Sequence, residues 1–327
     1  MNKSTCDNST QGGPVSEPQV SVSGMQRYGR GQLLPSYVVI TPARNEAQFI
    51  EQTIRCMIAQ TAPPLRWVIV SDGSTDGTDE IVRCYTQDYA WIQLLRMPER
   101  VDRHFGGKAN AFNAGYASVR DLHPDVIGNL DADLTFDPGL FEYLVGKFAE
   151  DERLGVCGAP FREGEKQYDY RYTNINHVSG ACQLFRRDCL DAVGGYKPLK
   201  MGSIDYVAVT SARMIGWKTR TFTEHVCTHH RDMGTAKQGI AKARYHQGCK
   251  DYAVGNHPLW EVFRITYQMR NRPYVLGGVF IAAGYLGAMI RRRGRSVTPD
   301  LMAFTRREQF ARLKDTILSF CFRGETQ

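Results

Sequence analysis

The chain has 327 residues, a formal net charge of +7 and a sequence pI of about 8.9. Hydrophobic residues make up 42% and charged residues 23%, which is ordinary for a globular protein that buries a core and excludes a wholly disordered chain. The positive excess suits an anionic partner, such as a phosphorylated substrate, an acidic membrane surface or nucleic acid, but composition does not choose among them.

The first 33 residues are rich in Ser, Gly, Gln and Pro, which predicts a disordered leader. They lack the apolar segment of a secretory signal. Strands are then predicted at 36–41, 65–70, 91–95 and 126–130, and helices at 46–60, 78–86 and 109–119. Strands that alternate with helices predict an α/β fold with a mostly parallel central sheet.

Polar side chains follow several of these strands. Asn45 and Glu46 come after the first, Asp72 after the second, and Asp131 and Asp133 after the fourth. In open α/β sheets, ligands bind outside the carboxyl ends of the strands. The sequence therefore predicts one site that draws on all three groups.

Beyond residue 150 the pattern is less regular, with strands predicted at 154–160 and 180–186 and a helix at 205–215. A basic segment at 236–272 holds seven Lys or Arg residues against Asp251 and Glu261, with aromatic residues between them. This segment is either a surface for acidic lipids or an ordinary solvated helix. No recognised module accompanies the charge, so nucleic acid is not a predicted partner.

The segment 273–290 has 18 uncharged residues with arginines on both sides. Its length is at the lower limit for a helix that spans a bilayer. A re-entrant or interfacial membrane anchor fits it better, and the alternative is a buried helix, such as one at an oligomer interface.

Several single residues suggest the chemistry. Two closely spaced carboxylates at a strand end, Asp131 and Asp133, typically bind a hard divalent cation, although paired turn or cap aspartates look the same in sequence. Asp72 would accept a hydrogen bond from a base such as uracil, or would cap a helix. Lys108 would meet a phosphate near a helix N-terminus, or is an exposed lysine.

Five blocks taken together resemble the family 2 glycosyltransferases of the GT-A type. They are Thr41-Pro-Ala-Arg-Asn-Glu46, Ser71-Asp-Gly-Ser-Thr-Asp-Gly-Thr78, Gly107-Lys-Ala-Asn-Ala-Phe-Asn113, Asn129-Leu-Asp-Ala-Asp133 and the acceptor-side segment 180–196. Their order and spacing match the family over roughly residues 36–230. The resemblance implies a GT-A catalytic domain at 34–232, with a Rossmann-like sheet, followed by a helical, membrane-associating extension at 233–327.

The resemblance also implies roles for individual residues. Glu46 and Asp72 would contact the nucleoside of a UDP- or GDP-type donor, and Lys108 would lie near its diphosphate. Asp131 and Asp133 would hold Mg²⁺ or Mn²⁺, with either His229 or His230 as a further metal ligand. Asp205 matches the family's catalytic base. The remaining predicted donor-binding residues are Pro42, Arg44 and Asn113.

The implied reaction is the inverting transfer of one sugar to a glycan or lipid-linked acceptor, in exopolysaccharide or cell-envelope synthesis. The sequence lacks the QxxRW signature of processive members, which favours single transfers. It also has Ile204 where the family commonly has an acid before the base, and Ser71 before Asp72. The alternatives are a catalytically silent sugar-nucleotide-binding or assembly protein and a nucleotidyltransferase.

The chain has nine cysteines, an odd number, and no CxxC motif. This favours reduced thiols in the cytoplasm over a framework of disulfides. Together with the apolar segment, this predicts a cytoplasmic protein associated with the cytoplasmic face of the membrane.

Overall fold

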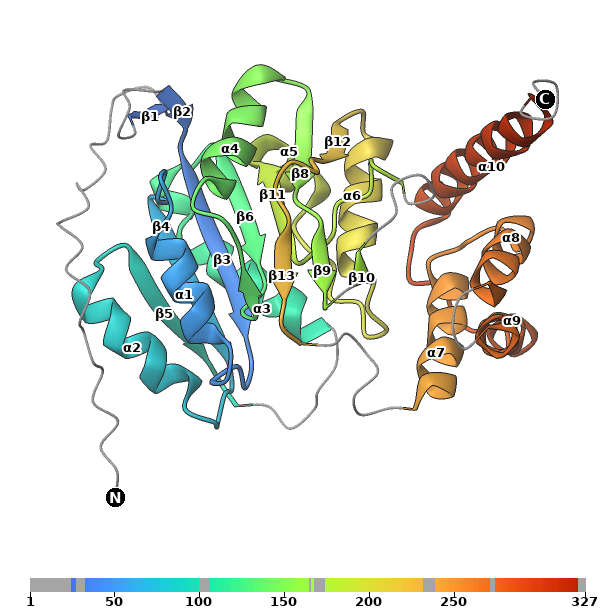
Figure 1. Ribbon diagram of the computed structural model, residues 1–327, viewed down its shortest axis with the longest axis horizontal. Coiled ribbons are helices and arrows are strands. Elements are labelled where there is room, and N and C mark those ends of the chain that lie inside the picture. Colours follow the sequence, from blue (N-terminus) through green and yellow to red (C-terminus); the bar gives the residue numbers. More distant parts are fainter. Residues whose placement is uncertain are drawn as a thin grey trace.

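The computed structural model describes residues 25–27, 33–99, 106–164, 166–167, 174–231, 239–270 and 274–322. A seven-stranded sheet forms its centre, in the order β12-β8-β11-β6-β3-β4-β5 (Figure 1). Neighbouring strands are parallel except where β11 pairs with β6 and β8. The predicted mostly parallel sheet is therefore confirmed. Its strands are β3 (Tyr37–Ala43), β4 (Arg66–Asp72), β5 (Ile92–Met97), β6 (Val126–Leu130), β8 (Leu154–Gly158), β11 (Cys182–Arg186) and β12 (Lys218–Thr221).

Helices cover both faces of this sheet, which explains why apolar side chains of its central strands are buried on both sides. In β3, Tyr37 and Val39 point to the face covered by α1, α2 and α4. Val38 and Ile40 point to the opposite face, covered by α3, α5 and α6. The covering elements are α1 (Ile50–Ile58), α2 (Thr78–Asp88), α3 (Gly106–Ser118) with the short turn η1 (Arg120–Leu122), α4 (Leu140–Glu150), α5 (Arg187–Val193) and α6 (Ile204–Met214).

A second, smaller sheet has the order β10-β9-β13-β7. Its strands are β7 (Leu134–Thr135), β9 (Phe161–Glu163), β10 (Lys166–Gln167) and β13 (Cys227–His229). In β13, His229 pairs with Leu134 of β7, and Cys227 pairs with Phe161 of β9. This sheet therefore brings residues from three distant parts of the sequence to the end of β6.

The predicted disordered leader at 1–33 needs one correction. Met25–Arg27 form strand β1, which pairs antiparallel with β2 (Leu33–Pro35). The backbone hydrogen bonds of β2 give this short segment a partner that composition alone does not reveal. Residues 1–24 and 28–32 lie outside the described residues.

Four helices follow the sheet and gather beside α6 (Figure 1). They are α7 (Ile240–Ala253), α8 (Pro258–Met269), α9 (Val275–Ile290) and α10 (Pro299–Phe322). Arg213 of α6 forms a two-bonded ion pair with Glu308 of α10, at 2.7 and 2.8 Å. In the part of the chain that the structure describes, no helix combines the length and the apolar character needed to cross a bilayer.

Helices α7 and α9 approach closely because glycines face each other at their contact. A Cβ atom on Gly284 would lie 2.0 Å from the carbonyl oxygen of Tyr245, and one on Gly248 would lie 2.0 Å from that of Ile281. Both neighbours are backbone atoms, so a side chain at either position forces the helices apart.

We therefore expect Gly284→Val to lower the free energy of unfolding by about 3 kcal/mol, the upper range for overpacked sites. Urea denaturation monitored by circular dichroism measures this change. Gly294→Ala is the control, because a Cβ atom at Gly294 would have no neighbour within 4 Å. Equal stability of the two variants would contradict the expected close contact.

Candidate active site

Three side chains at the end of β6 form a candidate metal centre. One ligand atom each from Asp131, Asp133 and His229 lies within 4.8 Å of the other two. Nε2 of His229 is 3.4 Å from Oδ1 of Asp133, and both of these side chains are buried. Two neighbouring carboxylates repel each other unless a cation lies close by, and oxygen and imidazole ligands suit a divalent ion such as Mn²⁺. The residues therefore fit a bound metal.

The structure separates the two candidate histidines. His230 donates its backbone N–H to the carbonyl oxygen of Asp133, and its ring turns away, with Nε2 2.9 Å from Oγ1 of Thr135. That ring also stacks on Phe49. Successive side chains of a strand point in opposite directions, so only His229 is directed toward the carboxylates.

Glu163, at the end of β9, lies behind His229. Its Oε1 is 3.3 Å from Nδ1 of the histidine. A carboxylate at this nitrogen favours the tautomer that leaves Nε2 free to bind a metal. The sequence analysis missed Glu163, because only the parallel pairing of β13 with β9 brings it to the site.

The first two sequence motifs are joined by hydrogen bonds into one edge of the site. The backbone N–H of Thr75 donates to Oδ1 of Asn45, and the backbone N–H of Glu46 donates to Oγ1 of Thr78. Asn45 has a φ of 57°, a left-handed conformation that turns the chain at the end of β3. These bonds fix the backbone that carries Glu46 at this edge.

Asp72 ends β4 and is nearly buried, with Nη1 of Arg44 3.9 Å from its Oδ2. Pro42 lies in the same part of β3, opposite Val70 of β4. Pro42, Arg44 and Asp72 therefore share the edge that carries Glu46. The side chain of Asn113, in α3, donates to the carbonyl oxygen of Tyr196 and accepts from the Tyr196 N–H.

Arg231 is a second residue that the sequence analysis did not identify. Its Nη2 donates to Oε2 of Glu46 at 2.5 Å and to the carbonyl oxygen of Asn45 at 3.2 Å. Its Nε lies 3.9 Å from Oδ2 of Asp133. Burial and the nearby Asp133 carboxylate raise the pKa of Glu46 to about 8, although Arg231 acts in the opposite direction. Arg231 therefore places a cation beside the candidate metal centre.

Lys108, near the start of α3, connects the candidate metal centre to Gly180. Its ammonium group forms an ion pair with Asp131 and donates to the carbonyl oxygen of Gly180 at 3.1 Å. Burial alone would lower the pKa of Lys108, but Asp131, with smaller contributions from Asp205 and Asp133, raises it. The lysine is thus held in its charged form.

Gly180 joins Lys108 to Asp205. While its carbonyl oxygen accepts from Lys108, its N–H donates to Oδ2 of Asp205 at 3.1 Å. A Cβ atom on Gly180 would lie 2.8 Å from Cβ of Asp205, so this approach requires glycine. The neighbouring Ile204 packs into the core beneath α6. An apolar residue therefore suits position 204, where the family commonly has an acid.

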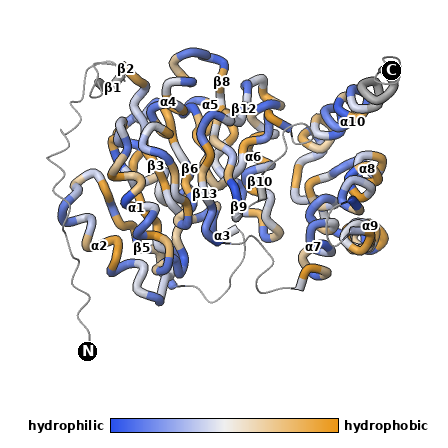
Figure 2. Tube along the Cα trace, viewed as in Figure 1, coloured by the Kyte–Doolittle hydropathy of each residue, from blue (hydrophilic) through white to orange (hydrophobic). Residues whose placement is uncertain are grey.

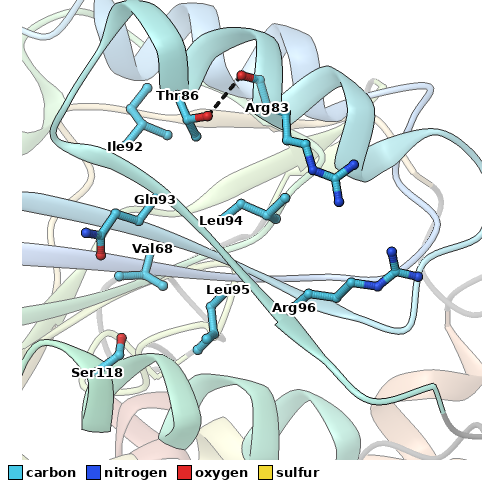
Figure 3. Close-up of a pocket in the computed structure, with 9 residues that line it drawn as sticks. All are labelled: Val68, Arg83, Thr86, Ile92, Gln93, Leu94, Leu95, Arg96 and Ser118. Atoms are coloured by element: carbon cyan, nitrogen blue, oxygen red, sulfur yellow. Dashed lines mark hydrogen bonds between the residues drawn. The ribbon is translucent and has the colours of Figure 1, made fainter.

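A separate hollow lies at the edge of the large sheet, lined by residues of α2, β5 and α3 (Figure 3). Arg83 and Arg96 both project along it, and each forms an ion pair with Asp79. None of the residues of the candidate metal centre lines this hollow. It is therefore distinct from the candidate active site.

Comparison with known proteins finds related sequences. The model of the family "Glycosyl transferase family 2" matches residues 38–196. The chain is 32% identical over 282 residues to a probable glycosyltransferase, YdaM, of Bacillus subtilis, covering 83% of this chain and 62% of that protein. It is 26% identical over 200 residues to a poly-β-1,6-N-acetyl-D-glucosamine synthase of Staphylococcus epidermidis, covering 54% of this chain and 44% of that protein. The chain thus spans less than two thirds of the length of either relative.

Solved structures share the fold. One is a mannosyltransferase of Pyrobaculum calidifontis in complex with GDP-Man and Mn²⁺, with a TM-score of 0.55 and 20% identity, covering 88% of this chain and 81% of that one. Another is TarS of S. aureus in complex with UDP-GlcNAc, with a TM-score of 0.51 and 13% identity, covering 78% and 73%. With the family match, the ordered motifs and the sheet topology in agreement, residues 38–196 of the chain form a family 2 glycosyltransferase domain with the GT-A fold.

Proposed function

We propose that this chain is a metal-dependent, inverting glycosyltransferase that moves one sugar from a nucleotide diphosphate donor to an acceptor. The observation that carries the proposal is the link between two groups at one end of the sheet. Asp131, Asp133 and His229 form a candidate metal centre, and Lys108 and Gly180 connect it to the carboxylate of Asp205. A leaving-group site and a base are thus adjacent.

For the donor, we assign the nucleoside to Glu46 and Asp72, with Pro42, Arg44 and Asn113 as further donor-side positions. The diphosphate is assigned to Lys108, and Mg²⁺ or Mn²⁺ to Asp131, Asp133 and His229, with Asp133 the more direct ligand. A bound divalent cation stabilises the negative charge that the departing diphosphate acquires. GDP-Man and UDP-GlcNAc in the two similar structures support a UDP- or GDP-type donor.

For the transfer step, we assign Asp205 as the general base. The acceptor hydroxyl attacks the anomeric carbon, its proton passes to the Asp205 carboxylate, and the bond from that carbon to the diphosphate oxygen breaks. Attack from the face opposite the leaving group inverts the anomeric centre. Asp131 holds the ammonium group of Lys108 near the leaving group. There its positive charge stabilises the negative charge that develops on the departing diphosphate.

The acceptor is proposed to be a glycan or a lipid-linked glycan at the cytoplasmic face of a membrane, in polysaccharide or cell-envelope synthesis. The polysaccharide synthase among the relatives supports this class of product. The seven cysteines that the structure describes are all free thiols, which suits the cytoplasm. We assign catalysis to residues 34–232 and membrane association to residues 233–327.

Isothermal titration calorimetry with UDP, GDP, CDP and dTDP, each with and without Mn²⁺, tests the donor site. We expect one diphosphate to bind in a metal-dependent manner. The matching nucleotide sugars then serve as donors in a product assay by mass spectrometry. If a folded sample binds none of the four, the proposal fails and a silent assembly protein becomes the better explanation.

Replacing Arg231 tests the cation that the sequence analysis missed. We expect Arg231→Gln to weaken binding of the diphosphate about tenfold, because the variant removes the cation beside the candidate metal centre. It also removes the charge-assisted hydrogen bond to Glu46, and such a bond contributes about 1.5–3 kcal/mol. The same titration measures this effect. Arg220→Gln, an exposed arginine of β12, is the matched control and should bind as the wild type does. Unchanged affinity in Arg231→Gln would remove this residue from the donor site.

A further inference from the structure

Helix α9 is apolar around its whole circumference. One side carries Gly278, Ile281, Gly284 and Tyr285, which are buried against α7 and α8. The opposite side is exposed, at residues spaced three or four apart: Leu276, Val279, Ala283, Leu286 and Ile290. Val279 and Leu286 are each 47% exposed and Ile290 is 77% exposed. A surface helix normally presents polar residues on that side, so this stripe needs an apolar partner.

Helix α8 packs beside α9 and adds to the apolar surface. Ile265 and Met269 of α8 are close to Gly278 of α9. The outer side of α8 exposes Leu259 and Val262, each at 60%. Figure 2 shows α8 and α9 at the edge of the molecule, on the side away from the sheet. We define the docking face as Leu259 and Val262 of α8 with Leu276, Val279, Leu286 and Ile290 of α9.

The charge that flanks the docking face in the sequence is mostly positive. Residues 262–299 contain seven arginines and no aspartate or glutamate, although Arg264 is paired with Asp251, and the exposed Asp300 follows this stretch. Arg270 ends α8, and Arg291, Arg292 and Arg293 follow α9; all four are exposed. An apolar face flanked by arginines matches the boundary between the acyl chains and the anionic headgroups of a bilayer. A protein partner would have to supply both an apolar groove and a ring of acids.

The length of α9 sets how it would lie. Its 16 residues extend about 24 Å, less than the roughly 30 Å of a hydrocarbon core. Its inner side is also occupied by α7 and α8. An orientation along the membrane surface, with only the outer stripe in contact with lipid, satisfies both constraints.

We propose that the docking face binds the surface of an anionic lipid bilayer and holds the acceptor side of the active site next to it. This inference deepens the proposed function and rests on it for the meaning of the acceptor side. Met201, in the loop before α6, packs against the cluster that joins α7 and α9. Leu199 and Tyr206 pack against Val254 and Leu301. Asp205 lies in the first turn of α6, so these contacts connect the docking helices to the element that carries the proposed base.

Co-sedimentation of the full chain with lipid vesicles tests the proposal. We expect binding to vesicles of 7:3 phosphatidylcholine and phosphatidylglycerol, weaker binding at high salt, and little binding to phosphatidylcholine alone. Val279→Glu with Leu286→Glu should weaken binding at least about tenfold, because two charges enter the apolar stripe. Leu122→Glu, at an exposed leucine of η1, is the matched control and should bind as the wild type does.

Two further variants keep the test decisive. Val279→Ser with Leu286→Ser removes apolar surface without adding charge, and should also weaken binding while circular dichroism and thermal unfolding stay unchanged. Arg291→Gln with Arg292→Gln and Arg293→Gln should reduce both the affinity and its salt dependence. Unaltered vesicle binding in the Val279 and Leu286 variants would overturn the proposal. So would a wild-type dimer in sedimentation velocity that these variants dissociate, since the face would then join two proteins.

Donor binding separates this inference from the proposed function. The docking variants should retain metal-dependent diphosphate binding, because their positions lie outside the donor site. A chain that binds vesicles but no nucleotide would leave the docking face standing and reject the glycosyltransferase proposal. A chain that binds nucleotide but not anionic vesicles would do the reverse.

Discussion

Asp205→Asn is expected to lower kcat for sugar transfer by about 10²- to 10⁴-fold, the usual contribution of a positioned general base. The amide is nearly the same size as the carboxylate, and its oxygen still accepts the hydrogen bond from the Gly180 N–H. The fold and the donor site should therefore be preserved. What the variant loses is the ability to take the proton of the acceptor hydroxyl.

The measurement is a steady-state assay of the donor identified by calorimetry, with donor affinity measured on the same samples. The affinity should change less than about threefold, so the loss appears in kcat. Asp188→Asn in α5 is the control, because this carboxylate is largely exposed and lies on another helix. Full activity in Asp205→Asn would assign the base to a different residue.

Removing Asp133 should have the largest effect on binding. We expect Asp133→Ala to weaken metal-dependent binding of the diphosphate by at least about 100-fold, more than the 10- to 100-fold typical when a residue behind a metal ligand is lost. Asp133 contributes a nearly buried carboxylate that faces both His229 and Arg231. Its loss removes the central oxygen ligand and half of the negative charge of the DxD pair.

A histidine pair provides the matched comparison. His229→Ala should weaken Mn²⁺-dependent binding by about tenfold or more, whereas His230→Ala should leave it within about threefold. Both are single histidine deletions at neighbouring positions, but only the ring of His229 faces the carboxylates. Calorimetry and Mn²⁺-dependent thermal shifts read out both variants. If His230→Ala proved the more damaging, the proposed ligand set would be wrong.

Much of the fold could be predicted from local sequence. The predicted strand at 126–130 matches β6 along its whole length, and the one at 65–70 overlaps β4. Buried parallel strands are short apolar runs bounded by turn residues, so periodicity and composition are sufficient to identify them. The helices α4 and α5 were not predicted. Helix α5 lies beyond residue 150, where the pattern is less regular, whereas α4 has apolar residues at helical spacing (Leu140, Leu144 and Phe148) that the sequence analysis missed.

The sequence alone determined the residue types of the site, because motifs at the ends of consecutive parallel strands must meet at one edge of the sheet. It identified Asp72, Asp131 and Asp133 in this way, and family resemblance added Asp205.

Only the tertiary structure decided which side chains complete the site. Pairing of β13 with β7 and β9 directs His229 inward and brings Glu163 behind it. Likewise, 273–290 is apolar on every side in sequence, and only its packing against α7 and α8 distinguishes a buried side from an exposed one. Contacts between segments far apart in the chain leave no local periodicity, so a single sequence does not record them.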